Sequence, residues 1–173
     1  MYLCSTCRGN KDINNMYAKC APLAKKQEEE KLARLTGHAK SKAYGNKFFK
    51  EGRYEDAIQH YTRVCDGLTD EARGDDKQTL ISCLNNRALC WMQQQNYRQV
   101  IMDTTRSIGL DDTKANIKAY FRRATAFEGV EKYRSALADI RICTQAMPSW
   151  DAANKAQYRL DQAVRTLKQT TSA

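Results

Sequence analysis

Residues 117–148 read IKAYFRRATAFEGVEKYRSALADIRICTQAMP and contain two amphipathic stretches on either side of a short turn at 129–131. In the second stretch Ala136, Ile140 and Cys143 recur at the spacing of one helix face. Pro148 ends that stretch, because proline cannot continue a helix. The segment therefore predicts two helices joined by a turn, a helical hairpin.

The register of this hairpin occurs three times in the chain. A small residue is followed nine positions later by a tyrosine and three positions after that by a second small or medium-sized apolar residue. The three sets are Gly45, Tyr54 and Ala57, then Ala88, Tyr97 and Val100, then Ala124, Tyr133 and Ala136. We expect the first small residue where the two helices cross, and the tyrosine at the start of the second helix. Three hairpins follow, with the other two turns at 51–53 and 94–96.

Helices are also predicted on both sides of the hairpins, so the fold class is all-α. The apolar residues Ala153, Ala156, Leu160, Val164 and Leu167 form one stripe of a terminal capping helix, with Ser149 as its N-cap. Residues 24–37 are rich in Lys, Glu and Gln and also predict helix. We place a polar loop at 69–76. The chain divides into a partly helical extension at 1–37, three repeats within 38–148 (about 38–71, 81–114 and 117–148) and a cap at 149–169.

Composition limits the function classes. The chain has 173 residues with 29 Lys+Arg against 20 Asp+Glu, a net charge of +9 that favours acidic partners. It has no apolar run long enough for a membrane span and no secretory signal in residues 1–20. The seven cysteines are an odd number, and we interpret most as buried thiols of a cytoplasmic protein. No catalytic or cofactor motif is present, so we expect a monomeric binding protein that is not an enzyme and has no cofactor.

Five polar residues on the first helices of the hairpins are not needed by a helical bundle. Asn46 and Asn86 lie inside predicted helices, where asparagine is mildly unfavourable. Lys118 and Arg122 are four residues apart, so two like charges share one helix face. With Lys42, these residues place three cations and two amides at matching levels of three neighbouring helices. Such donors suit a carboxylate, and two carboxylates meet at the C-terminus of a peptide that ends in Asp.

The hairpin register resembles the tetratricopeptide repeat (TPR), which implies a right-handed superhelix of helix pairs over residues 38–148. The segments KAYGN (42–46), NRALC (86–90) and KAYFR (118–122) resemble the carboxylate clamp of TPR co-chaperones, most closely the UNC-type myosin chaperones and mitochondrial-import co-chaperones. This resemblance implies binding of the Glu-Glu-Val-Asp tail of the 90- or 70-kDa heat-shock proteins. It also implies that Phe49 and Leu89 line a pocket for an aliphatic side chain of that tail.

Three alternatives stay open at this stage. The groove could hold an internal segment of an assembly partner, in which case the protein is a structural scaffold. A basic surface with Arg122, Arg123 and Arg134 could bind nucleic acid, which would require a stripe of one charge sign with aromatic residues. Finally, Cys4 and Cys7 resemble half a zinc site that Cys20 and His38 could complete, but no second close pair supports it.

Overall fold

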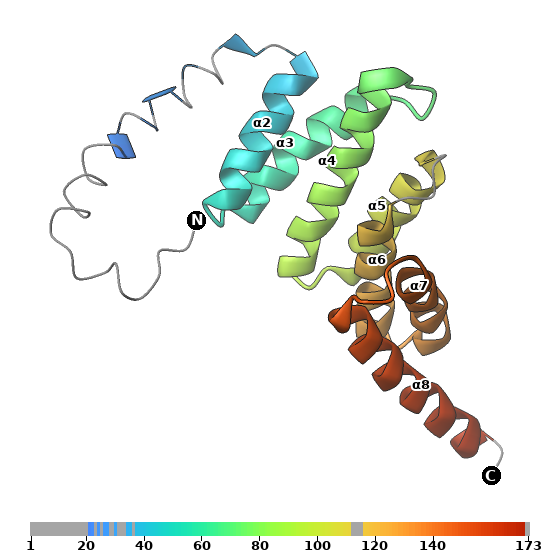
Figure 1. Cartoon of the computed structure of the whole chain (residues 1–173). Coiled ribbons are helices and arrows are strands. Elements are labelled where there is room, and N and C mark those ends of the chain that lie inside the picture. The colour runs from blue at the N-terminus through green and yellow to red at the C-terminus, as the bar shows by residue number, and fades with distance from the viewer. Residues whose placement is uncertain are drawn as a thin grey trace, which may run out of the picture.

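The computed structural model describes residues 37–111 and 116–171, together with residues 21, 22, 24, 26, 27, 30, 34 and 35. The described part contains seven α-helices of substantial length and no β-strand, which confirms the all-α prediction (Figure 1). The helices are α2 (Gly37–Lys50), α3 (Tyr54–Gly67), α4 (Gly74–Gln93), α5 (Tyr97–Leu110), α6 (Ile117–Gly129), α7 (Tyr133–Ala146) and α8 (Asp151–Thr171).

The helices pack as three consecutive hairpins and a final helix. The pairs α2–α3, α4–α5 and α6–α7 make the most extensive contacts, each pair packs against the next, and α8 packs against α7 (Figure 1). The first helices of the hairpins also touch each other, α2 against α4 and α4 against α6. This stack confirms the predicted architecture and brings the three first helices together. The division into repeats at the boundaries given above stays a prediction.

The three turns within the hairpins share one backbone geometry. Gly52, Gln95 and Glu131 each have a positive φ, between 57° and 76°. In each turn the next residue donates its N–H to a carbonyl five residues earlier, as Arg53 does to Phe48 at 2.9 Å. This is the Schellman motif, which uses carbonyls left free at a helix C-terminus. The third turn lies at 130–132, one residue later than predicted, because Gly129 is still helical.

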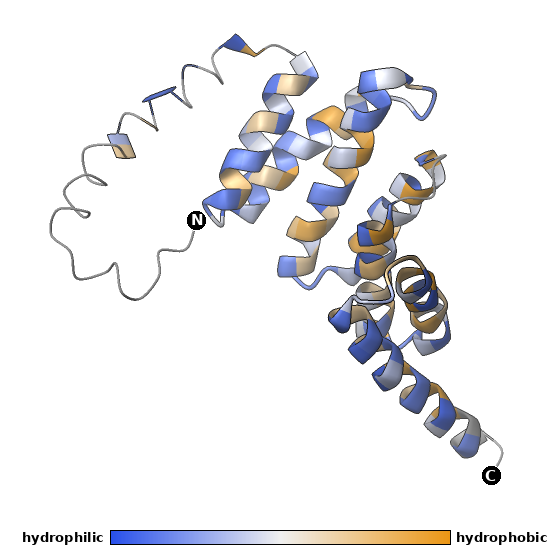
Figure 2. Ribbon diagram, viewed as in Figure 1, coloured by the Kyte–Doolittle hydropathy of each residue, from blue (hydrophilic) through white to orange (hydrophobic). Residues whose placement is uncertain are grey.

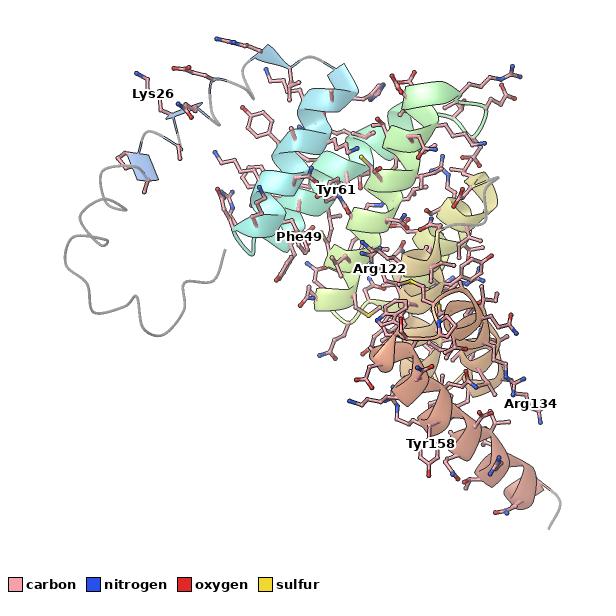
Figure 3. The ribbon with its side chains drawn as sticks, viewed as in Figure 1. Lys26, Phe49, Tyr61, Arg122, Arg134 and Tyr158 are labelled. Atoms are coloured by element: carbon pink, nitrogen blue, oxygen red, sulfur yellow. The ribbon has the colours of Figure 1, made fainter. Side chains whose placement is uncertain are left out.

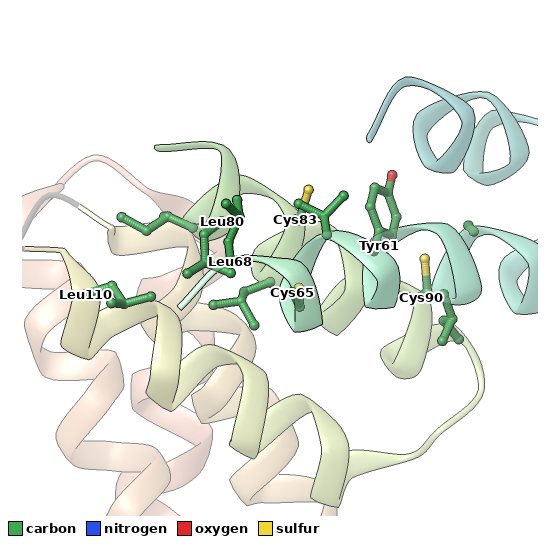
Figure 4. Close-up of a cluster of buried hydrophobic side chains, with 12 residues drawn as sticks. Tyr61, Cys65, Leu68, Leu80, Cys83, Cys90 and Leu110 are labelled. Atoms are coloured by element: carbon green, nitrogen blue, oxygen red, sulfur yellow. The ribbon is translucent and has the colours of Figure 1, made fainter. Parts of the chain in front are cut away.

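Small residues permit the close crossing of the helices. Ala88 and Ala124 are buried at the expected positions. Gly45 is packed so closely that a Cβ there would lie 2.6 Å from the ring of Tyr61. Apolar residues from α3, α4 and α5 form the largest core cluster, and Figure 4 shows Tyr61 projecting out of it from α3. Figure 2 shows that apolar positions of the helices are turned toward neighbouring helices.

Two local expectations were wrong. Helix α4 begins at Gly74, so the predicted polar loop ends before 74 instead of at 76. The first turn of α4 contains Asp75 and Asp76, which stabilise a helix N-terminus. Helix α8 begins at Asp151, so Trp150, and not Ser149, precedes its first residue. The carbonyl of Trp150 accepts the first N–H bonds of that helix.

Four cysteines fall inside the stack, as predicted for most of the seven. Cys65, Cys83, Cys90 and Cys143 are buried free thiols. Burial raises the pKa of each thiol, to about 11 for Cys65 and to about 12 for Cys83. These thiols therefore stay protonated near neutral pH and are poor nucleophiles. Cys4, Cys7 and Cys20 lie outside the described residues.

Candidate functional site

Four of the five predicted polar residues line one groove. Lys42 comes from α2, Asn86 from α4, and Lys118 and Arg122 from α6, around a space of about 510 Å³. Ser82, Asn85, Asn116, Ile117 and Met147 complete the lining. Figure 3 labels Arg122 near α4 and α6. The stacking of the three first helices thus brings together residues that are up to 80 positions apart in the sequence.

The fifth predicted residue, Asn46, lines a second pocket that shares Asn86 with the groove. This pocket has a volume of about 330 Å³ and includes both residues that were expected to receive an aliphatic side chain, Phe49 and Leu89. Tyr61 and Lys50 complete its lining. The ring of Tyr54 lies 5.7 Å from that of Phe49. The two spaces meet at Asn86, so a charged end and an apolar side chain of one extended ligand can lie side by side.

The groove carries positive charge without matching acids. Its lining has three cations and no Asp or Glu. Arg122 is partly buried, and desolvation lowers the pKa of its guanidinium. Within the described residues Arg122 forms no ion pair. A desolvated cation without a counter-charge is unfavourable until an anion is bound. The groove is therefore suited to an acidic ligand.

The two asparagines adopt a defined arrangement. The Asn46 Oδ1 accepts a hydrogen bond from the Tyr61 hydroxyl at 2.8 Å and another from the Asn86 Nδ2 at 3.0 Å. Because its oxygen is occupied twice, Asn46 has its NH₂ group left for a ligand. Together with Lys42, Lys118 and Arg122, it makes a set of hydrogen-bond donors. Such a set matches carboxylate oxygens, which only accept.

A triangle of polar side chains under the groove was not foreseen. Asn85 donates to Asn116 at 3.1 Å, Asn116 donates to Ser107 at 2.8 Å, and Ser107 donates to Asn85 at 3.0 Å. The three residues come from α4, from the residue before α6 and from α5, respectively. The triangle ties the start of α6 to both helices of the preceding hairpin and so positions Lys118. No local pattern marks these residues, because they meet only after the hairpins stack.

Two buried ion pairs were also missed. Arg87 donates from Nε and Nη2 to the two Asp103 carboxylate oxygens, at 2.8 and 2.7 Å. Arg123 binds Asp139 in the same way, at 2.7 and 2.8 Å. The third contact of each arginine is a threonine of the preceding hairpin, Thr62 for Arg87 and Thr105 for Arg123. The signal was present in the sequence, since both pairs are 16 residues apart.

The first hairpin has an aromatic contact at the equivalent place. Tyr44 and His60 are also 16 residues apart, and their rings stack with centroids 5.5 Å apart. Burial lowers the pKa of His60, with a smaller contribution from the Arg63 charge. Its Nδ1 has no hydrogen-bond partner within the described residues. Within the described residues no hairpin precedes the first one, so an arginine there would have no threonine of a preceding hairpin to contact.

The zinc hypothesis is not tested by the structure. Of its four residues only His38 lies in the described part, where a Cβ on Gly67 would contact its ring. The described residues include no cluster of three or more His, Cys, Asp or Glu side chains arranged for a metal. They also include no helix long and apolar enough to cross a membrane. Of the three arginines considered for a nucleic-acid surface, Arg123 forms an ion pair with Asp139.

The chain is similar in sequence to several known proteins. No family model matches the chain. The Hsp70/Hsp90 co-chaperone cns1 of Schizosaccharomyces pombe is 36% identical over 106 residues, which are 61% of this chain and 28% of the relative. The chain spans no more than 28% of any of the curated relatives considered.

Solved structures show the same architecture. The first TPR of Spaghetti (RPAP3), bound to the HSP90 peptide SRMEEVD, matches with a TM-score of 0.63 at 25% identity, covering 74% of this chain and 93% of that one. The myosin chaperone UNC-45 of C. elegans, in complex with a Hsp90 peptide, matches with a TM-score of 0.69 at 27% identity, covering 80% of this chain and 15% of that one. Both matches extend over most of the described residues.

Proposed function

We propose that this chain, a tetratricopeptide-repeat domain homologous to those of cns1, RPAP3 and UNC-45, binds the acidic C-terminal tail of a 90- or 70-kDa heat-shock protein. The observation that carries the proposal is the groove itself. Three cations converge there without an acidic partner, and one of them, Arg122, is desolvated. An Asp-ended tail supplies two carboxylates at one residue, which matches this excess of positive charge.

Each of the five clamp residues (Lys42, Asn46, Asn86, Lys118 and Arg122) has a role in this proposal. The cations make charge-assisted hydrogen bonds to the main-chain and side-chain carboxylates of the terminal Asp. The guanidinium of Arg122 can donate two parallel bonds to one carboxylate. The two asparagines donate amide hydrogens without adding mutual repulsion. The adjoining pocket with Phe49 and Leu89 takes the aliphatic side chain next to the end of the tail.

We also propose that the domain acts by binding alone and works in the cytoplasm as an adaptor or co-chaperone module. The described thiols support a non-enzymatic role, because burial keeps them protonated and out of reach of a substrate. The relative cns1 is by its name a co-chaperone. The competing function is a scaffold that holds an internal segment of an assembly partner. It differs in one respect, since an internal segment has no free terminal carboxylate.

The direct test is calorimetric titration with the peptide SRMEEVD, which the RPAP3 domain binds. We expect a dissociation constant on the order of micromolar, about 8 kcal/mol. Added salt should weaken binding, since the clamp charges are only partly buried. A scrambled peptide that keeps the same net charge but ends in Arg is the control. No binding at about 100 μM peptide in low salt would contradict the proposal.

A further inference from the structure

Tyr61 has an unusual place in the core. Its side chain is fully buried, yet its hydroxyl reaches the floor of the binding site and donates to the Asn46 Oδ1 at 2.8 Å. Figure 3 labels Tyr61 between α2 and α4, and Figure 4 shows its hydroxyl oxygen at the end of the ring that points away from the apolar cluster. Desolvation raises the pKa of Tyr61 well above its ordinary value, so the hydroxyl stays protonated and remains a donor.

The contacts of Asn46 determine which of its atoms faces the ligand. An asparagine side chain has an oxygen that accepts and a nitrogen that donates, and a half-turn exchanges them. The Nδ2 of Asn86 and the hydroxyl of Tyr61 both donate a hydrogen bond to the Oδ1 of Asn46. Only the Asn46 oxygen can accept both, so its nitrogen is the polar atom left for a ligand in the pocket that Asn46 lines beside the groove. If the Asn46 amide were turned by a half-turn, its NH₂ group would face two donors, those of Asn86 and Tyr61. Without the Tyr61 hydroxyl it would face only one, so this orientation becomes less unfavourable.

The first hairpin is built to accommodate this tyrosine. A Cβ on Gly45 would lie 2.6 Å from the Tyr61 ring, so the ring fits only beneath a glycine. At the equivalent places in the second and third hairpins, alanine replaces the glycine, and Thr104 and Ile140 replace the tyrosine. Thr104 donates to the carbonyl of Val100 in its own helix. Support of a clamp asparagine from below is thus confined, among the three hairpins, to the first.

We propose that Tyr61 is a specificity-determining positioning residue, which holds Asn46 with its nitrogen free for the ligand so that the site selects a free C-terminal carboxylate over a neutral carboxamide. This inference rests on the proposed function. A carboxylate offers only acceptors to the groove, whereas a carboxamide has an NH₂ group that would meet the Asn46 NH₂ group. An asparagine free to turn could accommodate both ligands.

The test compares two forms of SRMEEVD, one ending in a free acid and one ending in an amide, on the wild type and on Tyr61→Phe. Phenylalanine keeps the ring beneath Gly45 and removes only the hydroxyl. We expect the ratio of the two dissociation constants, amide over acid, to fall about fivefold in Tyr61→Phe, the factor that corresponds to a lost hydrogen bond of about 1 kcal/mol. Tyr97→Phe is the matched control, because Tyr97 lies outside both pockets, and its ratio should equal that of the wild type.

A double-mutant cycle with Asn46→Ala tests whether the hydroxyl acts through Asn46. Once Asn46 is absent, Tyr61→Phe should leave the ratio unchanged, whereas a general loosening of the core would lower it again. If the wild type discriminates and Tyr61→Phe discriminates equally, the inference is wrong. If the wild type binds neither peptide, or binds both equally, the proposed function itself fails. Should Tyr61→Phe prove unfolded by circular dichroism, the ratio for Asn46→Ala decides, and a ratio equal to that of the wild type overturns the inference.

Discussion

Arg122 and Arg123 are neighbours in the sequence, yet they belong to two different regions of the molecule. Arg122 turns to the groove, is desolvated, and forms no ion pair with any described residue. Arg123 points away from the groove, where Asp139 of its own hairpin binds it with two hydrogen bonds and Thr105 of the preceding hairpin with one. Asn86 and Arg87 repeat this division one hairpin earlier. The comparison separates charges that hold the stack together from charges that are available to a ligand.

The largest effect should follow from breaking the ion pair between Arg123 and Asp139. The side chains of Arg123 and Asp139 are only 17% and 7% exposed, so Arg123→Ala leaves a buried carboxylate without its partner. We expect a loss of about 3–5 kcal/mol in the free energy of unfolding, measured by urea denaturation. Arg122→Ala is the matched control, because it removes the same side chain one position away. Equal stability of the two variants would contradict the division.

Removing a groove cation should affect binding and spare the fold. Arg122→Ala or Lys118→Ala loses a charge-assisted contact worth roughly 1.5–3 kcal/mol, which is about 10- to 150-fold in the dissociation constant of SRMEEVD. Each change also relieves the repulsion between these two cations, so the thermal midpoint should hold or rise slightly. Calorimetry and a thermal melt measure both. A large fall in the midpoint would mark these residues as structural and remove them from the site.

A smaller effect is expected in the apolar pocket. Leu89→Ala enlarges the space beside Asn86 and removes contacts to the aliphatic side chain of the tail, at about 1 kcal/mol or roughly fivefold in affinity. The loss should disappear when the valine of SRMEEVD is replaced by alanine, because the two groups are then no longer in contact. Leu167→Ala, on the exposed part of α8, is the control. A loss of the same size with both peptides would show that Leu89 does not face the tail.

The smallest effect concerns the first hairpin, where Tyr44 and His60 replace the ion pair. The folded-state pKa of His60 lies below its unfolded value of about 6.5, so the folded protein binds fewer protons. The stability of the neutral form is present above that value and is lost as the pH falls below it. Between about pH 7.5 and pH 5.5, the wild type should lose more stability to urea than His60→Phe does. Parallel losses would show that His60 does not titrate with folding.

The repeat register could be predicted, and so could the placement of the five polar residues around two adjoining spaces, because helix periodicity is local and the hairpins repeat. Gly45, Ala88 and Ala124 mark the crossings, and Lys42 and Arg122 then fall on the same side of the stack. Contacts that form only when a hairpin packs could not be located in the same way. Tyr61, for example, looks like an ordinary core aromatic in the sequence. Its contact with Asn46 depends on how α3 passes beneath Gly45, which is known only when the hairpin is packed.

Helix ends show a second limit of prediction. Gln95 and Glu131 adopt positive φ in turns where the sequence offers no glycine, so the shared geometry is imposed by packing of the hairpin. Acidic residues misled the prediction of the first loop, because Asp75 and Asp76 suit either a polar loop or the first turn of α4.

The central claim is that the groove recognises a free C-terminal carboxylate, and the most direct measurement compares SRMEEVD as acid and as amide on the wild-type domain by calorimetry. Amidation removes one negative charge. It also places the NH₂ group of the carboxamide against the donor groups of the clamp lysines and asparagines. An unpaired donor costs about 1–3 kcal/mol, and more when it is charged, as those of Lys42, Lys118 and Arg122 are, so the amide should bind at least roughly tenfold more weakly than the acid. Equal affinities would contradict the carboxylate clamp and favour a scaffold that binds an internal segment.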